Sequence, residues 1–120
     1  MNSLNWDTYP NFKEEEFRCS ETGENEMQPR FLEMLQALRT KYGKPMRITS
    51  GYRSPNHSIE RRKEKPGTHA HGIAADIYAV GPDKYRLVKL AFEMGFTGIG
   101  VDSNFIHLDC SRERCAIWSY

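Results

Sequence analysis

Two short segments of the chain carry side chains that can bind a metal ion. In the first, His69 stands at the end of a polar loop, and Asp76 follows inside an apolar stretch, between Ala75 and Ile77. An unpaired carboxylate is costly to bury in such a stretch, so a cation or several hydrogen-bond donors should meet it. A divalent metal ion would satisfy Asp76.

The second segment reads Phe-Ile-His-Leu-Asp and alternates between two kinds of side chain. Successive side chains of a strand point to opposite faces. Phe105, His107 and Asp109 would therefore share one face, while Ile106 and Leu108 would share the other. The segment predicts a strand with one apolar face and one face that carries chemical groups.

Together the two segments offer two imidazoles and one carboxylate, from His69, Asp76 and His107. If the two strands are neighbours, this is a catalytic zinc set that leaves one position for water. One zinc ion suits these donors best, although manganese, iron or cobalt can occupy a similar site. Taken singly, His69 and His71 can also be hydrogen-bonding loop residues, and Asp76 can cap a turn or pair with Arg53.

Other charged residues have structural as well as functional interpretations. Arg53 directly follows a short strand. Its guanidinium can donate paired hydrogen bonds to backbone carbonyls, or it can bind an anionic group of a substrate. Asp109 alone can belong to a structural salt bridge. We expect His57 to be solvated. The stretch from Glu60 to Lys65 is expected to be a solvated loop face, because its charges mix in sign and no aromatic residue interleaves.

Hydrophobic spacing indicates the helices that position these residues. Apolar residues three and four apart, with Pro29 near the start and Gly43 after the end, predict a helix from Met27 to Tyr42. The same spacing predicts a second helix from Asp83 to Met94, which stops at Gly95.

Four short apolar segments are expected to be strands, namely Met46–Thr49, Ile73–Ala79, Ile99–Val101 and Phe105–Cys110. Turn-forming residues 102–104 separate the last two, so we expect a hairpin there. The predicted fold class is α+β, with a small antiparallel sheet packed against two main helices. The loop from Gly51 to Gly72 is long for a compact domain, and its residue content favours a functional role.

The composition bounds the class of protein. The 120 residues are expected to form one domain, residues 1–120, and the formal net charge of +1 gives no broad basic surface for nucleic acid or anionic lipid. No apolar run approaches the roughly 20 residues of a membrane span, and the first ten residues lack a signal peptide's features. We expect a monomer that is made in the cytoplasm.

Cys19, Cys110 and Cys115 are expected to be free thiols, with a disulfide open as an alternative outside a reducing cytosol.

Three motifs carry a resemblance to a known family. The chain contains Ile-Thr-Ser-Gly-Tyr-Arg ending at Arg53, Thr-His-x-x-Gly-x-Ala-x-Asp at residues 68–76, and the later segment around His107. Together these resemble the zinc D-alanyl-D-alanine carboxypeptidase family, whose relatives include phage endolysin L-alanyl-D-glutamate peptidases. Its superfamily also contains lysostaphin-type endopeptidases and the hedgehog signalling domain. The resemblance covers nearly the whole chain, is closest to short single-domain members, and implies their fold.

The resemblance also implies roles for individual residues. His69, Asp76 and His107 correspond to the zinc ligands of the family. Arg53 corresponds to an arginine that contacts the substrate or a developing oxyanion.

The general base is where the chain departs from the family pattern. Many relatives place an acid three residues before the last ligand, or a histidine two residues before it, but here these positions are Asn104 and Phe105. Asp109, on the same strand face as the last ligand, is the preferred candidate. Asp102 across the turn is the second candidate, and His71 is the third.

The implied reaction is zinc-assisted hydrolysis of peptide bonds in bacterial peptidoglycan stem peptides. The enzyme would be a carboxypeptidase or an endopeptidase such as a phage lysin, acting at the cell wall, in the periplasm or on the virion. A peptidoglycan peptide is the expected partner. The alternative is a non-catalytic, zinc-stabilised binding domain or virion structural domain, as in the hedgehog branch.

Overall fold

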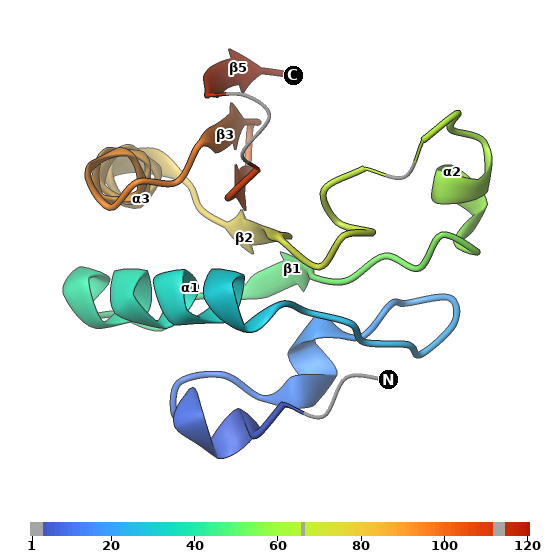
Figure 1. Cartoon of the computed structure of the whole chain (residues 1–120). Helices are drawn as coiled ribbons and strands as arrows, with labels where there is room; N and C mark the ends of the chain where they lie inside the picture. Colours follow the sequence, from blue (N-terminus) through green and yellow to red (C-terminus); the bar gives the residue numbers. More distant parts are fainter. Residues whose placement is uncertain (1–3, 66, 112–114) are drawn as a thin grey trace.

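A five-stranded mixed sheet forms the centre of the computed structural model, which describes residues 4–65, 67–111 and 115–120 (Figure 1). The strands lie in the order β1-β2-β4-β3-β5. Their bounds are Ile48–Ser50 for β1, Ala74–Tyr78 for β2, Gly98–Val101 for β3, Phe105–Asp109 for β4 and Ala116–Ser119 for β5. The four predicted strands are confirmed within two residues at each end, and the predicted hairpin is β3–β4.

The fifth strand was not expected from the sequence, and it makes the sheet mixed rather than antiparallel. β5 pairs in parallel with β3, whereas the other neighbouring strands are antiparallel. β5 lies beside β3 on the side away from β4. It therefore runs antiparallel to β4 and parallel to β3. Because β5 pairs with β3 and not with β4, the strand that precedes it in sequence, a parallel pair forms without a long helical crossover.

Two main helices cover the apolar side of the sheet, as predicted, and the fold class α+β is confirmed. α1 spans Pro29–Tyr42 and α3 spans Gly81–Glu93. Figure 1 shows both helices at one side of the molecule and the long loop with α2 at the opposite side. The described chain also contains α2 (Ser58–Arg61) and two 3-10 helices, η1 (Trp6–Thr8) and η2 (Glu14–Phe17). None of its helices has the length and apolar character needed to cross a bilayer.

Alternation along β2 and β4 divides the sheet into a core face and a chemical face. Ile77 pairs with Ile106 and Ala75 pairs with Leu108, and all four side chains belong to the same buried core as the inner face of α1. The side chains between them must point the other way. The helices thus cover one face of β2 and β4 and leave the other for polar groups.

The long loop between β1 and β2 is more ordered than the sequence suggested. It contains α2, and the expectation that His57 is solvated is wrong, because this residue is only 8% exposed. Its Nδ1 accepts a hydrogen bond from the backbone N–H of Ile59, and its Nε2 lies 3.1 Å from a carboxylate oxygen of Glu21. The stretch from Glu60 to Lys65 was expected to be a solvated loop face, and this is wrong for Glu60, which is buried. The partner of His57 lies far away in sequence, so local pattern gave no signal.

Gly72 fixes how the chain enters β2. Its φ is 72°, and a Cβ at this position would overlap the carbonyl oxygen of Glu26. The Gly72 carbonyl in turn accepts a hydrogen bond of 2.8 Å from the backbone N–H of Gln28. The glycine of the family motif is therefore required by a close backbone approach, which sets the position of the preceding loop.

None of the three cysteines forms a disulfide, as expected. Cys19 and Cys110 are buried, and Cys115 is exposed.

Replacement of Gly72 by alanine should destabilise the protein much more than the same change at Gly43. Both glycines have a φ of +72° to +76°, but a Cβ at Gly43 would meet nothing within 4 Å. Gly43→Ala should cost about 1 kcal/mol of unfolding free energy, from the left-handed backbone alone. Gly72→Ala should cost roughly 2 kcal/mol more, because the backbone of Glu26 must also move. Urea unfolding of the two variants measures this difference, and equal costs would contradict it.

Candidate metal centre

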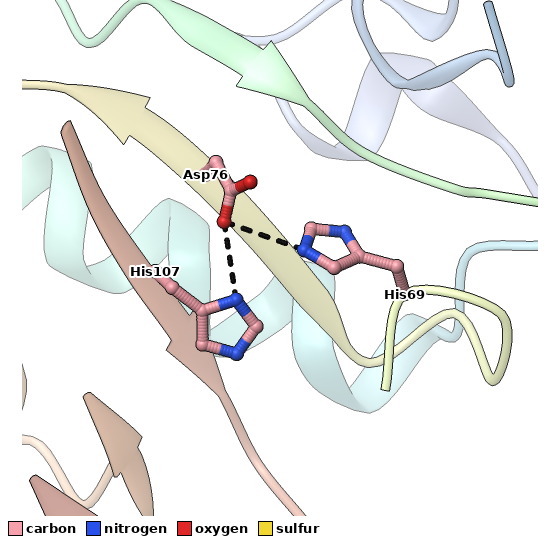
Figure 2. A group of neighbouring side chains, drawn as sticks. All are labelled: His69, Asp76 and His107. Atoms are coloured by element: carbon pink, nitrogen blue, oxygen red, sulfur yellow. Dashed lines mark hydrogen bonds and ion pairs between the residues drawn. The ribbon is translucent and has the colours of Figure 1, made fainter. Parts of the chain in front are cut away.

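The β2–β4 ladder places Asp76 directly opposite His107 on the face that the helices leave uncovered. His69 comes from the loop that enters β2. One ligand atom from each of the three residues lies within 4.8 Å of the others. Figure 2 shows the three side chains pointing toward one another, with both rings directed at the same oxygen of Asp76. His107 Nδ1 lies 3.1 Å and His69 Nε2 lies 3.3 Å from that oxygen.

A backbone carbonyl sets the tautomer of His69. Its Nδ1 lies 2.8 Å from the carbonyl oxygen of Gly51, which directly follows β1. A carbonyl can only accept, so Nδ1 must carry the proton. Nε2 is thereby the ring nitrogen that faces Asp76 and that would bind a metal ion.

A buried carboxylate plays the same part for His107. Its Nε2 lies 2.8 Å from Oδ2 of Asp109, which is fully buried, while the other oxygen of Asp109 accepts a hydrogen bond from the backbone N–H of Ser111. The space for this carboxylate is provided by Gly98 of β3, where a Cβ would overlap it. Nε2–H therefore donates to Asp109, and Nδ1 is directed toward Asp76.

The electrostatics of the cluster favour binding of a cation. Burial alone would raise the pKa of Asp76, but hydrogen bonds from His107 and His69 outweigh it and hold the pKa well below its ordinary value. Burial would lower the pKa of His107, yet the carboxylates of Asp109 and Asp76 outweigh it and raise the pKa. Asp76 is thus a charged carboxylate at neutral pH, as a metal ligand must be.

A cavity of about 1080 Å³ adjoins the cluster, and His69, Asp76 and His107 are among the residues that line it. Three cationic side chains also line it, from Arg30, Arg53 and Lys63, as do the aromatic rings of Phe105, Trp118 and Tyr120. The candidate metal centre therefore faces a space large enough for a peptide, with cationic and aromatic groups on its walls.

The candidate bases predicted from sequence occupy three different surroundings. Asp109 lies behind His107 with both oxygens engaged, which suits it to orient that ring rather than to accept a proton from the cavity. Asp102 accepts a hydrogen bond from the N–H of Ser103 inside the β3–β4 turn, and it is not among the described residues that line the cavity. His71 lines the cavity and is exposed, without belonging to the three-residue cluster.

Arg53 lines the cavity but does not pair with Asp76. Its Nη1 lies 3.2 Å from Oε2 of Glu60, and its backbone N–H donates to the carbonyl of His69. One-fifth of its side chain is exposed. The arrangement combines a structural ion pair with access to the cavity.

Sequence reasoning missed the aromatic residues in β5 and directly after it. The ring centroid of Trp118 lies 5.4 Å from that of His107, and Gly100 on β3 makes room for the indole. Tyr120 packs beside Phe105, with a centroid distance of 5.5 Å. The period-two spacing of Trp118 and Tyr120 was a signal for this strand, but a four-residue strand at the sheet edge is hard to distinguish from a loop.

Two histidines and one aspartate that face an open cavity are the donor set of a metallohydrolase. A family model described as Peptidase M15 matches residues 10–109, which is most of the chain. The chain therefore belongs to this family, which comprises zinc D-alanyl-D-alanine carboxypeptidases and endolysin-type peptidases, and the resemblance seen in the sequence is confirmed. The family is zinc-dependent and indicates a metallopeptidase. A search of curated proteins found no match.

We expect the purified chain to hold about one equivalent of zinc, and His69→Ala or His107→Ala to lose most of it. Each change removes one of the three donors found among the described residues. His71→Ala is the matched control, because it removes an imidazole from the same cavity but outside the cluster, and it should keep the metal. Metal analysis by mass spectrometry measures the content. Unchanged zinc in both ligand variants would exclude this site.

Asp109→Asn should lower the affinity for zinc by roughly 10-fold or more, because a neutral amide supports the Nε2–H of His107 less well. Asp102→Asn removes the same charge from the nearby turn and should leave the affinity unchanged. Competition with a chromophoric chelator gives both constants. Equal affinities in the two variants would show that Asp109 does not act through His107.

Proposed function

We propose that the chain is a zinc peptidase that cleaves a peptide bond in peptidoglycan stem peptides. His69, Asp76 and His107 would hold one zinc ion. When bound, zinc supplies polarisation of the scissile carbonyl and lowers the pKa of a coordinated water toward about 7. The observation that carries the proposal is the convergence of the three donors at the wall of a large cavity. The ring of His69 is held by the carbonyl of Gly51, and the ring of His107 is held by Asp109.

The walls of the cavity suit a peptide with carboxylate groups. Arg30, Arg53 and Lys63 line it, while Asp76 is the single acidic residue among the described lining residues. Stem peptides carry free carboxyl groups, which a guanidinium recognises through paired hydrogen bonds. We assign the carboxylate contact to Arg53, whose side chain is partly exposed and whose backbone is bonded to His69.

We assign proton transfer to His71. The first candidate from sequence, Asp109, is engaged by His107 and Ser111, and the second candidate, Asp102, lies in the turn. His71 is exposed at the cavity wall, two residues beyond a ligand. An imidazole at this wall can accept a proton from attacking water and return it to the leaving amine.

We further propose that the protein is made in the cytoplasm and acts as a monomer at the cell wall, in the periplasm or as part of a phage lysis system. The enzyme would be a carboxypeptidase or an endopeptidase.

A second candidate function keeps the metal without catalysis. It is favoured by the residues at the usual base positions, which are Asn104 and Phe105, and by the engagement of both oxygens of Asp109. The protein would then be a zinc-stabilised binding domain of a cell wall or virion.

Digestion of purified peptidoglycan separates the two functions. We expect the zinc-loaded protein to hydrolyse stem peptides, no hydrolysis after chelation or in His107→Ala, and recovery when zinc is restored to the chelated protein. Mass spectrometry of the released muropeptides identifies the bond, because each cleavage leaves a distinct pair of ends. Zinc-dependent thermal stability without any hydrolysed stem peptide would support the binding domain.

The same assay tests the assignment of His71. His71→Gln should lower turnover by roughly 10² while zinc content stays constant. Near-native turnover in this variant would remove His71 from the reaction.

A further inference from the structure

A buried carboxylate lies beside the cavity, outside the metal cluster. Glu60 is in the four-residue helix α2 and is 2% exposed. Its Oε2 accepts hydrogen bonds from Nη1 of Arg53 at 3.2 Å and from Nζ of Lys63 at 2.9 Å, and its Oε1 accepts one of 2.9 Å from the backbone N–H of Gly67. One side chain thus joins three points of the loop between β1 and β2.

Glu60 is ionised in this position. Burial alone would raise its pKa, but the hydrogen bonds from Gly67, Lys63 and Arg53 outweigh it and hold the pKa below its ordinary value. A buried ion pair adds little net stability compared with apolar residues of similar volume, whereas it does select one geometry of its partners. The contacts of Glu60 therefore point to positioning rather than to stability of the core.

Glu60 acts on two parts of the site. Through Arg53 it holds a guanidinium at the cavity wall, where the same group also lies 3.5 Å from Ser50 Oγ. Through Gly67 it holds the chain two residues before His69, whose carbonyl accepts from the backbone N–H of Arg53. The arginine and the loop of the first metal ligand are thus tied to the same carboxylate.

We propose that Glu60 is a positioning residue that holds Arg53 in the orientation in which it binds a substrate carboxylate. One N–H of the guanidinium points to Glu60, and others remain for an anion in the cavity. The inference rests on the proposed peptidase function for its substrate, but the order of the Arg53 side chain tests it without any substrate.

The sign of the effect separates positioning from charge. Loss of the Glu60 charge makes the cavity wall more positive, so electrostatics alone would strengthen binding of an anionic peptide. A positioning role requires the opposite, because a mobile guanidinium must be ordered before it can bind.

The first measurement is the NMR order parameter of the Arg53 Nε–Hε group in the zinc-loaded full chain, assigned with Arg53→Lys. It should fall in Glu60→Gln and stay unchanged in Glu64→Gln, which removes the same charge from an exposed residue of the same loop. Glu60→Asp keeps the charge but shortens the side chain, and it should also loosen Arg53. This second variant decides the question if Glu60→Gln does not fold. An unchanged order parameter in the folded Glu60 variants would overturn the proposal.

The second measurement is steady-state hydrolysis of soluble muropeptides. Glu60→Gln should raise KM about 10-fold, the scale of one hydrogen bond to a charged group, with kcat nearly unchanged. In the Arg53→Lys background, Glu60→Gln should raise KM no further, because the two residues act through one contact. A lower KM or additive losses would overturn the role in binding. If the wild-type protein cleaves no muropeptide, the peptidase function fails, while the order parameter still decides whether Glu60 positions Arg53.

Discussion

The pairing of Asp76 with His107 across the β2–β4 ladder is the contact on which the site depends. The two residues are directly opposite, on the face that the helices leave free, and their register neighbours Ile77 and Ile106 lie in the core. A shift of one residue would carry the whole set to the other face. The apolar core therefore enforces the alignment of the polar cluster, although no polar residue of the cluster contributes to that core.

Much of this arrangement could be predicted because it follows from local periodicity. Alternation along residues 105–109 separated the core side chains from His107 and Asp109, and an acid inside an apolar strand indicated that Asp76 needs a partner. Helix ends were marked by Pro29 and Gly43, which act through backbone geometry rather than through distant contacts. Such signals lie within a few residues of the features that they predict.

The remaining features depend on residues that meet only in the folded chain. Glu60 is one of several charges in a polar stretch, and nothing nearby in sequence distinguishes the one that Arg53 and Gly67 enclose. The orientation of Asp109 toward His107 rather than toward the cavity depends on space above Gly98, a residue on another strand. Period-two alternation gives the face of a residue, but it does not give which neighbour that residue contacts.

The separation of the ligands along the chain has a consequence for folding. His69 and His107 are brought together from the two ends of a segment that includes β2, α3 and β3. An ion bound to both would close this long loop, and a cross-link of such a loop removes about 3–4 kcal/mol of entropy from the unfolded chain in the simplest polymer account. Cys19, Cys110 and Cys115 form no disulfide. A metal ion in this centre would instead give the molecule a cross-link that is reversible, independent of redox conditions and governed by the supply of metal.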